Sequence, residues 1–254
     1  MGVVIIQQRK FDIDCIVFDK DDTLIAFNPL WGNRTQQWVE AIAATSGLAE
    51  SVKMELFSIL GYSIEQASAR AEGPLAVASI ETLFILAAGV LCQFGMPWHE
   101  ARSLAESCAQ ETILAAFDPT EICPRGDVAE VLRRLANANI RIAVVTSDDR
   151  LMTESTLEFL GVKDIVSSVV CGDDPIPNKP APDALWLISS QLGIEPNRIM
   201  MVGDTKSDMQ FAHNAGAAFC VAITPTIGGK SLQTVRADAI ISSIDDLKTD
   251  NASM

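Results

Sequence analysis

The stretch IVFDKDDTL, Ile16 to Leu24, decides how the rest of the chain is interpreted. Apolar residues suited to a buried strand run directly into Asp19, Asp21 and Asp22, which fall within four positions. Carboxylates that close together repel one another, and burying even one costs several kcal/mol unless another group compensates. Two interpretations follow. Either the carboxylates spread into water in an acidic turn, or a cation holds them together.

The composition is that of a packed globular protein with a strong excess of acid. The chain has 254 residues, of which 48% are hydrophobic and 20% charged, and its formal net charge is -14. Nucleic acids and anionic membranes are bound through basic patches, so we expect neither as a partner. If the ligand is an anion, local positive charge must overcome the overall field.

We expect a cytoplasmic protein with reduced cysteines. None of the six cysteines forms a CxxC pair, and the N-terminal residues MGVVIIQQRKFD are too short and wrongly ordered for a signal peptide. The apolar run Leu75–Phe94 is interrupted by Glu81, Thr82 and Gln93 and follows a Gly-Pro pair. It therefore predicts a buried helix and not a membrane span.

Short apolar runs alternate with helical stretches through the second half of the chain. The runs are Ile140–Thr146, Ile165–Val170, Arg198–Gly203, Ala217–Ile223 and Ala237–Ser242. Strands without polar alternation, separated by helices, are typical of a parallel sheet covered on both faces. With Ile13–Asp19 as the first strand, the sequence predicts a doubly wound, Rossmann-like α/β domain.

The region between residues 28 and 121 breaks this rhythm, because it consists of successive helical stretches with no convincing strand. We therefore predict an all-α domain over 28–121, inserted into an α/β core made of 1–27 and 122–254. The segment Asp118–Gly126 contains two prolines and a glycine, and we interpret it as the hinge that returns to the core.

Polar residues follow four of the predicted strands. In an open parallel sheet such residues gather at the carboxyl ends of the strands. In chain order they are Asp19 and Asp21, Thr146 and Ser147, Lys179 in a proline-rich loop, and Asp204 with Asp208.

These residue types suit a phosphoryl ligand. A carboxylate can attack phosphorus and hold it covalently, and Asp21, if the chain stays extended after Asp19, could donate a proton to the leaving oxygen and later activate water. Mg²⁺ prefers hard oxygen ligands and needs only one or two carboxylates beside substrate oxygens and water. A lysine and a hydroxyl would balance the remaining phosphoryl oxygens. Mg²⁺ and Lys179 would then hold the crowded carboxylates together.

Taken in order, these segments resemble the four motifs of the haloacid dehalogenase superfamily. The matching residues are DKDDT, the strand ending at Thr146, Lys179 in NKPAPD, and GDTKSD. The overall layout is most similar to the phosphoglycolate phosphatase-like members, and the helical insertion stands where that family carries a C1-type cap. Dehalogenases lack the second aspartate of the first motif, so Asp21 favours phosphoryl transfer.

The resemblance implies a role for each motif residue. Asp19 would be the nucleophile and a Mg²⁺ ligand, and Asp21 the general acid and base whose backbone carbonyl also binds the metal. Thr146, Ser147 and Lys179 would bind the phosphoryl group, and Lys179 would also steady Asp19. Asp204 would ligate Mg²⁺, and Asp208 would hold a metal-bound water.

Two positions depart from the family pattern. Asp22 stands where the family usually has glycine, and Ala26 where many relatives carry an acid. If position 22 needs a positive φ, aspartate tolerates it better than most residues, at some cost. An extra carboxylate there would either weaken phosphate binding or add to the metal shell.

Each of these residues also has a simpler interpretation. An Asp-rich turn is usually a solvated loop, Lys179 would otherwise be a surface lysine, and Asp208 an acid at a helix start. In the insertion, Arg34 and Arg70 could pair with a substrate carboxylate, but exposed arginines of no specific function are an equal alternative.

We therefore expect a Mg²⁺-dependent phosphatase of a small phosphorylated metabolite, with 2-phosphoglycolate as the best single substrate. A phosphotransferase or mutase with the same Asp19 chemistry is one alternative, and a non-catalytic binding or regulatory protein that keeps the fold is another. A homodimer formed through the helical insertion is the assembly we consider.

Overall fold

The structure, a computed structural model, describes residues 2–70, 73–115, 118–224 and 236–250. Contacts within the chain divide it into unit 1, Met1–Ala26 with Pro124–Met254, and unit 2, Phe27–Cys123. That unit 2 serves as a cap stays a prediction.

Unit 1 contains a parallel sheet of six strands, which confirms the predicted α/β fold class. In spatial order the strands are β10 (Ala239–Ile241), β9 (Phe219–Ile223), β8 (Ile199–Gly203), β3 (Cys15–Phe18), β6 (Arg141–Val145) and β7 (Val166–Val170). The first strand of this sheet in chain order, β3, lies in the middle with neighbours on both sides. Its residues are all buried, which explains why its sequence is apolar without alternation.

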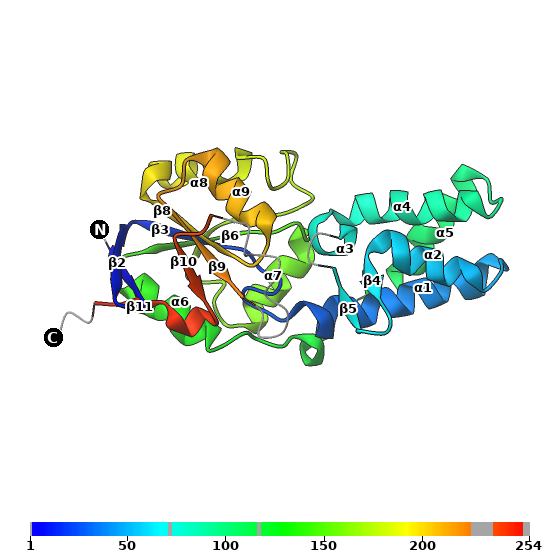
Figure 1. The fold of residues 1–254 in the computed structure, drawn as a ribbon, viewed down its shortest axis with the longest axis horizontal. Coiled ribbons are helices and arrows are strands. Elements are labelled where there is room, and N and C mark those ends of the chain that lie inside the picture. Colours follow the sequence, from blue (N-terminus) through cyan, green and yellow to red (C-terminus); the bar gives the residue numbers. More distant parts are fainter. Residues whose placement is uncertain (1, 71–72, 116–117, 225–235, 251–254) are drawn as a thin grey trace. The chain divides into compact units, whose positions relative to one another are not determined.

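Helices cover both faces of this sheet (Figure 1). They are α6 (Val128–Asn137), α7 (Arg150–Phe159), α8 (Asp183–Leu192) and α9 (Lys206–Ala215), with short 3₁₀ turns η3 (Pro196–Arg198) and η5 (Ile244–Asp246). On one face, α8 and α9 pack on the sheet over buried side chains such as Val17 and Met201. On the other, α6 is capped by Asp127, whose carboxylate accepts the Glu130 N–H at 3.1 Å.

Unit 1 also contains a second sheet, two of whose strands precede the predicted first strand. It is antiparallel and consists of β1 (Gly2–Ile6), β2 (Arg9–Ile13) and β11 (Lys248–Thr249). The prediction of one strand from Ile13 to Asp19 is therefore wrong at its start, because Ile13 ends β2 and β3 begins at Cys15.

Unit 2 is mainly helical. Its elements are η1 (Asn28–Gly32, a π-helical turn), α1 (Asn33–Ser46), α2 (Ser51–Leu60), β4 (Tyr62–Ser63), β5 (Ser68–Ala69), α3 (Pro74–Val77), α4 (Ile80–Gln93), α5 (Trp98–Gln110) and η2 (Pro119–Glu121). The small β4–β5 ribbon corrects the expectation of a strand-free insertion. Trp38 anchors the helices, since its ring is fully buried, lies edge-on to Phe84 and donates to the Ala105 carbonyl at 2.9 Å.

The apolar run Leu75–Phe94 forms two helices, and not one, because Ala78 and Ser79 between α3 and α4 are extended. Only one side of α4 is buried: Leu83 and Ala87 are covered, whereas Ile85 is 45% exposed. None of the helices in the described part of the chain is both long enough and apolar enough to span a membrane.

Candidate active site

The register of the parallel sheet brings three of the predicted segments to one level. Phe18, the last residue of β3, pairs with Val144 of β6 and with Val202 of β8. Asp19 continues this ladder by one step, donating its N–H to the Val202 carbonyl at 2.9 Å. Thr146 and Asp204 each lie two residues beyond the paired positions, so all three loops open at the same edge of the sheet.

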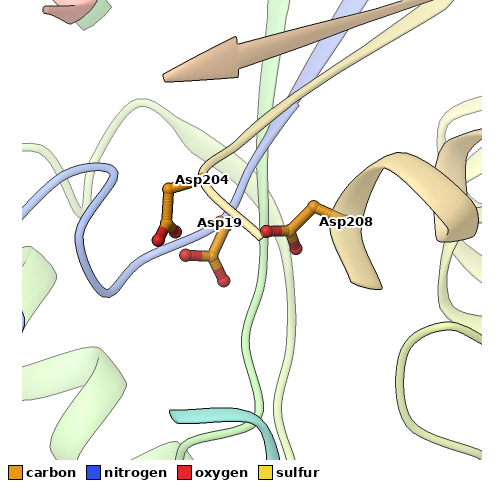
Figure 2. Close-up of side chains that lie close together, drawn as sticks. All are labelled: Asp19, Asp204 and Asp208. Carbon is orange, nitrogen blue, oxygen red and sulfur yellow. The ribbon is translucent and has the colours of Figure 1, made fainter. Parts of the chain in front are cut away.

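Three carboxylates meet at this edge. Asp19, Asp204 and Asp208 each offer an oxygen atom, and these atoms all lie within 4.8 Å of one another (Figure 2). Asp208 lies in the first turn of α9 and is completely buried. Its carboxylate accepts the Thr205 N–H at 3.0 Å while its own N–H donates to the Thr205 hydroxyl at 3.1 Å, which fixes its orientation.

Lys179 reaches this cluster from the loop that follows β7. Its ammonium donates to Asp19 Oδ1 and to Asp208 Oδ1, both at 2.6 Å, and to the Val145 carbonyl at 3.2 Å. Only 6% of the side chain is exposed. Burial opposes the charge of Lys179, but the two carboxylates outweigh it and hold the pKa of the ammonium above its usual range. The lysine is thus a fixed positive charge beside Asp19.

The cluster still carries more negative charge than Lys179 neutralises. Burial raises the pKa of Asp19 to about 7, a rise that Lys179 opposes and Asp208 increases. Burial also raises the pKa of Asp204 well above its ordinary value, with Asp19, Asp208 and Asp22 adding to the rise. Hard oxygen donors with unbalanced negative charge are the environment that Mg²⁺ prefers. The residues present therefore fit a divalent cation.

The loop after β6 carries the remaining predicted phosphate-binding residues. Thr146 is 4% exposed, and its hydroxyl accepts the N–H of Asp148 at 3.1 Å. Ser147 follows it, half-buried. The contact between Lys179 and the carbonyl of Val145, one residue before Thr146, brings this strand end next to the cluster. That Thr146 and Ser147 bind phosphate stays a prediction.

A family model for haloacid dehalogenase-like hydrolases matches residues 13–216. The chain belongs to this family. The resemblance seen in the four motifs is thereby confirmed at the level of the family. The match covers β3 through α9, which includes the ends of β3, β6, β7 and β8.

Comparison with individual relatives adds detail to the family assignment. The phosphoglycolate phosphatase of Pectobacterium atrosepticum is 32% identical over 123 residues, which cover 47% of this chain and 51% of that protein. The chain thus matches about half the length of this curated relative. Two crystal structures share the fold, each with a TM-score of 0.66: a predicted phosphoglycolate phosphatase from Haemophilus somnus (18% identical, 92% and 96% covered) and a HAD phosphatase from Thermococcus onnurineus (22%, 92% and 95%).

Asp22, the departure from the family's glycine, adopts a positive φ of 57°. Position 22 therefore does need a positive φ, and here an aspartate adopts it. Its carboxylate accepts a hydrogen bond from the Arg125 guanidinium at 3.1 Å. Arg125 also donates its backbone N–H to the Leu24 carbonyl at 2.9 Å, so the returning chain is tied to the loop that follows β3.

The haloacid dehalogenase motifs did not single out a second ion-pair group beside the cluster. Lys20 is completely buried, and its ammonium lies 2.7 Å from Asp21 Oδ2 and 3.0 Å from Asp148 Oδ2. Burial opposes the charge of Lys20, but attraction to both carboxylates holds the pKa of the ammonium above its usual range. Burial raises the pKa of Asp148 to about 7 against the opposing effect of Lys20. In the sequence, the only signal for this group is that Lys20 stands between Asp19 and Asp21, because a buried lysine needs carboxylate partners.

The two arginines considered for specificity differ in their surroundings within unit 2. Arg34 is 2% exposed; its guanidinium bonds both oxygens of Glu121 and donates to the Ala115 carbonyl at 2.9 Å. Its charge is therefore paired with Glu121 inside unit 2. That Arg34 binds a substrate carboxylate stays a prediction. Arg70 is exposed and donates to the Ser58 carbonyl at 3.0 Å.

Proposed function

We propose that this protein is a phosphatase that hydrolyses a small phosphomonoester through a phosphorylated Asp19. The observation that carries the proposal is the environment of the Asp19 carboxylate. Asp19 is only 7% exposed, accepts a hydrogen bond from Lys179 at 2.6 Å and lies beside two further carboxylates. Membership of a hydrolase family supports it, as does the similarity of half the chain to a phosphoglycolate phosphatase.

Mg²⁺ is the cofactor that this donor set suits best. Asp19, Asp204 and the backbone carbonyl of Asp21 would hold it, with Asp208 holding a metal-bound water. When bound, the ion would neutralise charge on the phosphoryl oxygens and on the carboxylates around them. Asp208 already has a second task, because it shares Lys179 with Asp19.

The reaction would proceed in two balanced steps on the side chains of this chain. First, an oxygen of Asp19 forms a bond to phosphorus as the bond from phosphorus to the ester oxygen breaks, and Asp21 gives its proton to that leaving oxygen. Second, Asp21 takes a proton from water as the water oxygen attacks phosphorus. The bond to Asp19 then breaks, which releases phosphate and restores the carboxylate.

Lys179 would act in both steps as a fixed cation. It orients Asp19 before the attack and would attract the phosphoryl oxygens during it, since it is charged and almost fully buried. Electrostatic stabilisation by a group that is already in place costs no reorganisation when the reaction occurs.

The substrate we propose to test first is 2-phosphoglycolate. The support is the name of the relative that is 32% identical over 123 residues, about half its length. A panel of phosphomonoesters that includes 2-phosphoglycolate would be assayed with Mg²⁺ and with EDTA, using the wild type, Asp19→Asn and Asp164→Asn. Asp164 serves as the matched control because its carboxylate is 66% exposed in a surface pair with Arg133.

We expect phosphate release by the wild type and by Asp164→Asn in Mg²⁺ only, and none by Asp19→Asn. Covalent catalysis requires the nucleophile, so the rate of phosphate release by Asp19→Asn should be lower by more than about 1,000-fold. Activity that survives both EDTA and Asp19→Asn would refute the mechanism. Faster release from another ester would replace 2-phosphoglycolate and leave the mechanism standing.

A further inference from the structure

The loop that follows β3 contains a lysine in an unusual position. Lys20 lies between Asp19 and Asp21 in the sequence, and none of its side chain is exposed. Its ammonium lies between Asp21, whose side chain is 16% exposed, and Asp148, which is 4% exposed. All three residues belong to unit 1, so the group forms within the α/β core.

Asp148 is held rigidly by the loop after β6. Its Oδ1 accepts the N–H of Asp149 at 2.8 Å, and its carbonyl accepts the N–H of Gly172 at 2.7 Å. Gly172 must be a glycine at this close approach, because a Cβ there would lie 2.0 Å from the Ser147 carbonyl oxygen. The Oδ2 atom that faces Lys20 therefore has a fixed place relative to the ends of β6 and β7.

Lys20 links Asp148 to Asp21, because its ammonium contacts both carboxylates. Its own carbonyl accepts the N–H groups of Leu24 and Ile25 at 2.8 and 3.1 Å, so the backbone that carries the ammonium is also held. Asp21, in turn, forms a backbone bridge with Ile25. Both the main chain and the carboxylate of Asp21 thus have local restraints, and the chain from Asp148 through Lys20 to Asp21 Oδ2 is a bridge between two strand ends.

Stability alone does not explain a buried group of one ammonium and two carboxylates. Replacing a buried ion pair by apolar side chains of similar volume is often neutral or stabilising, because the charges lose their hydration. Holding a reactive group in one orientation is a different benefit, which apolar side chains cannot supply.

We propose that Lys20 and Asp148 are positioning residues for Asp21, holding its carboxylate in the orientation from which it exchanges protons with the ester oxygen and with water. The inference rests on the proposed function, in which Asp21 is the general acid and base. It extends that function to Lys20, a residue of the first motif that has no role assigned to it above, and to Asp148, which follows the second motif.

The experiment compares two esters of similar size whose leaving oxygens need a proton to different degrees. Benzyl phosphate releases a strongly basic alkoxide, and 4-nitrophenyl phosphate releases a weakly basic phenolate. The ratio of their kcat/KM values, which reports the step that breaks the ester bond, is measured for the wild type, Asp148→Asn and the double variant Lys20→Met/Asp148→Leu. The double variant removes the two most buried ions together, so neither Lys20 nor Asp148 is left without the other.

We expect both variants to lose about 10-fold or more in kcat/KM on benzyl phosphate beyond any loss on 4-nitrophenyl phosphate, because general acid catalysis matters mainly for the basic leaving group. Asp148→Asn keeps the shape of the side chain and serves where the double variant does not fold. A loss of equal factor on both esters, or on neither, would overturn the positioning role.

Asp19→Asn, assayed on the same two esters, separates the inference from the function on which it rests. If Asp19→Asn keeps its activity, the phosphorylated-Asp19 mechanism fails and the inference fails with it. If Asp19→Asn is inactive and the ester ratio is unchanged in the Lys20 and Asp148 variants, the mechanism stands and the inference alone is wrong.

Discussion

Gly203 gives the sharpest test of the packing around the acidic cluster. This residue ends β8 just before Asp204. A Cβ at position 203 would lie 2.5 Å from Cγ of Asp208 and 2.6 Å from both its Cβ and its Oδ2. Moving Asp208 aside would cost free energy, because it is fully buried and accepts hydrogen bonds from Lys179 and Thr205. We therefore predict that Gly203→Ala displaces Asp208 or the end of β8.

The expected magnitude has two parts. Forcing an extra methyl group into a packed interior costs about 1–3 kcal/mol. Weakening the cap that the Thr205–Asp208 pair provides to α9 costs about 1 kcal/mol more. The free energy of unfolding should fall by about 2–4 kcal/mol, which lowers the Tm of a unit of this size by roughly 4–16 °C.

The assay is differential scanning calorimetry with and without Mg²⁺, together with phosphatase activity. The same substitution at Gly89 is the control, since a Cβ there meets nothing within 4 Å and the residue lies inside helix α4. Gly89→Ala should stabilise by about 0.5–1 kcal/mol and leave activity unchanged. If Gly203→Ala melts within about 2 °C of the wild type and keeps its Mg²⁺ response, the packing argument is wrong.

Two further predictions concern arginine pairs. Arg34→Met should lower the free energy of unfolding by about 2–4 kcal/mol, because it leaves the partly buried Glu121 without its cation. Urea titration measures this loss, and KM should stay unchanged. A raised KM at unchanged stability would instead support a role of Arg34 in specificity. Arg125→Gln should raise KM for the phosphate ester about 5-fold at low salt and less at high salt, because the Asp22 charge near Asp204 loses its partner. Adding Asp22→Gly should restore the KM, and a double variant as poor as Arg125→Gln would contradict this electrostatic explanation.

The central part of the fold was readable because parallel strands have a simple sequence pattern. β3 and β8 are buried on both faces, so their residues are apolar without alternation and end abruptly at a polar residue. A parallel sheet then places all such ends at one edge. That is why Asp19, Lys179, Asp204 and Asp208 could be assigned to one site although they are far apart in the chain.

The N-terminal hairpin was not predicted, and its turn explains the omission. Gln7 and Gln8 connect β1 to β2, and both adopt positive φ angles, 48° and 68°. Two-residue turns of this kind normally contain Asn-Gly or Asp-Gly, and these residues are the usual signal of a hairpin. A Gln-Gln pair is not a recognised turn signal, and its positive φ angles cost conformational free energy. The tertiary packing of β1 must offset that cost.

Contacts between loops were the other feature beyond the reach of sequence patterns. Lys20 and Asp148 are distant in the chain, and each has an ordinary interpretation alone. Their meeting depends on the register in which β3 pairs with β6, Phe18 opposite Val144, which apolar runs do not encode. The pairing of Asp22 with Arg125 likewise depends on the path of the returning chain.

The local charges also bear on the question of how so acidic a protein binds an anion. In the described site the carboxylates are Asp19, Asp21, Asp22, Asp148, Asp204 and Asp208, and the cations paired with them are Lys20, Lys179 and Arg125. Every one of these cations is already bonded to a carboxylate, so the group as a whole repels a phosphate ester. The chain's own residues orient the reacting groups without supplying the net positive charge that an anionic substrate requires. A divalent cation bound beside these residues would supply that charge, so the excess of carboxylates supports the proposal that Mg²⁺ is the cofactor.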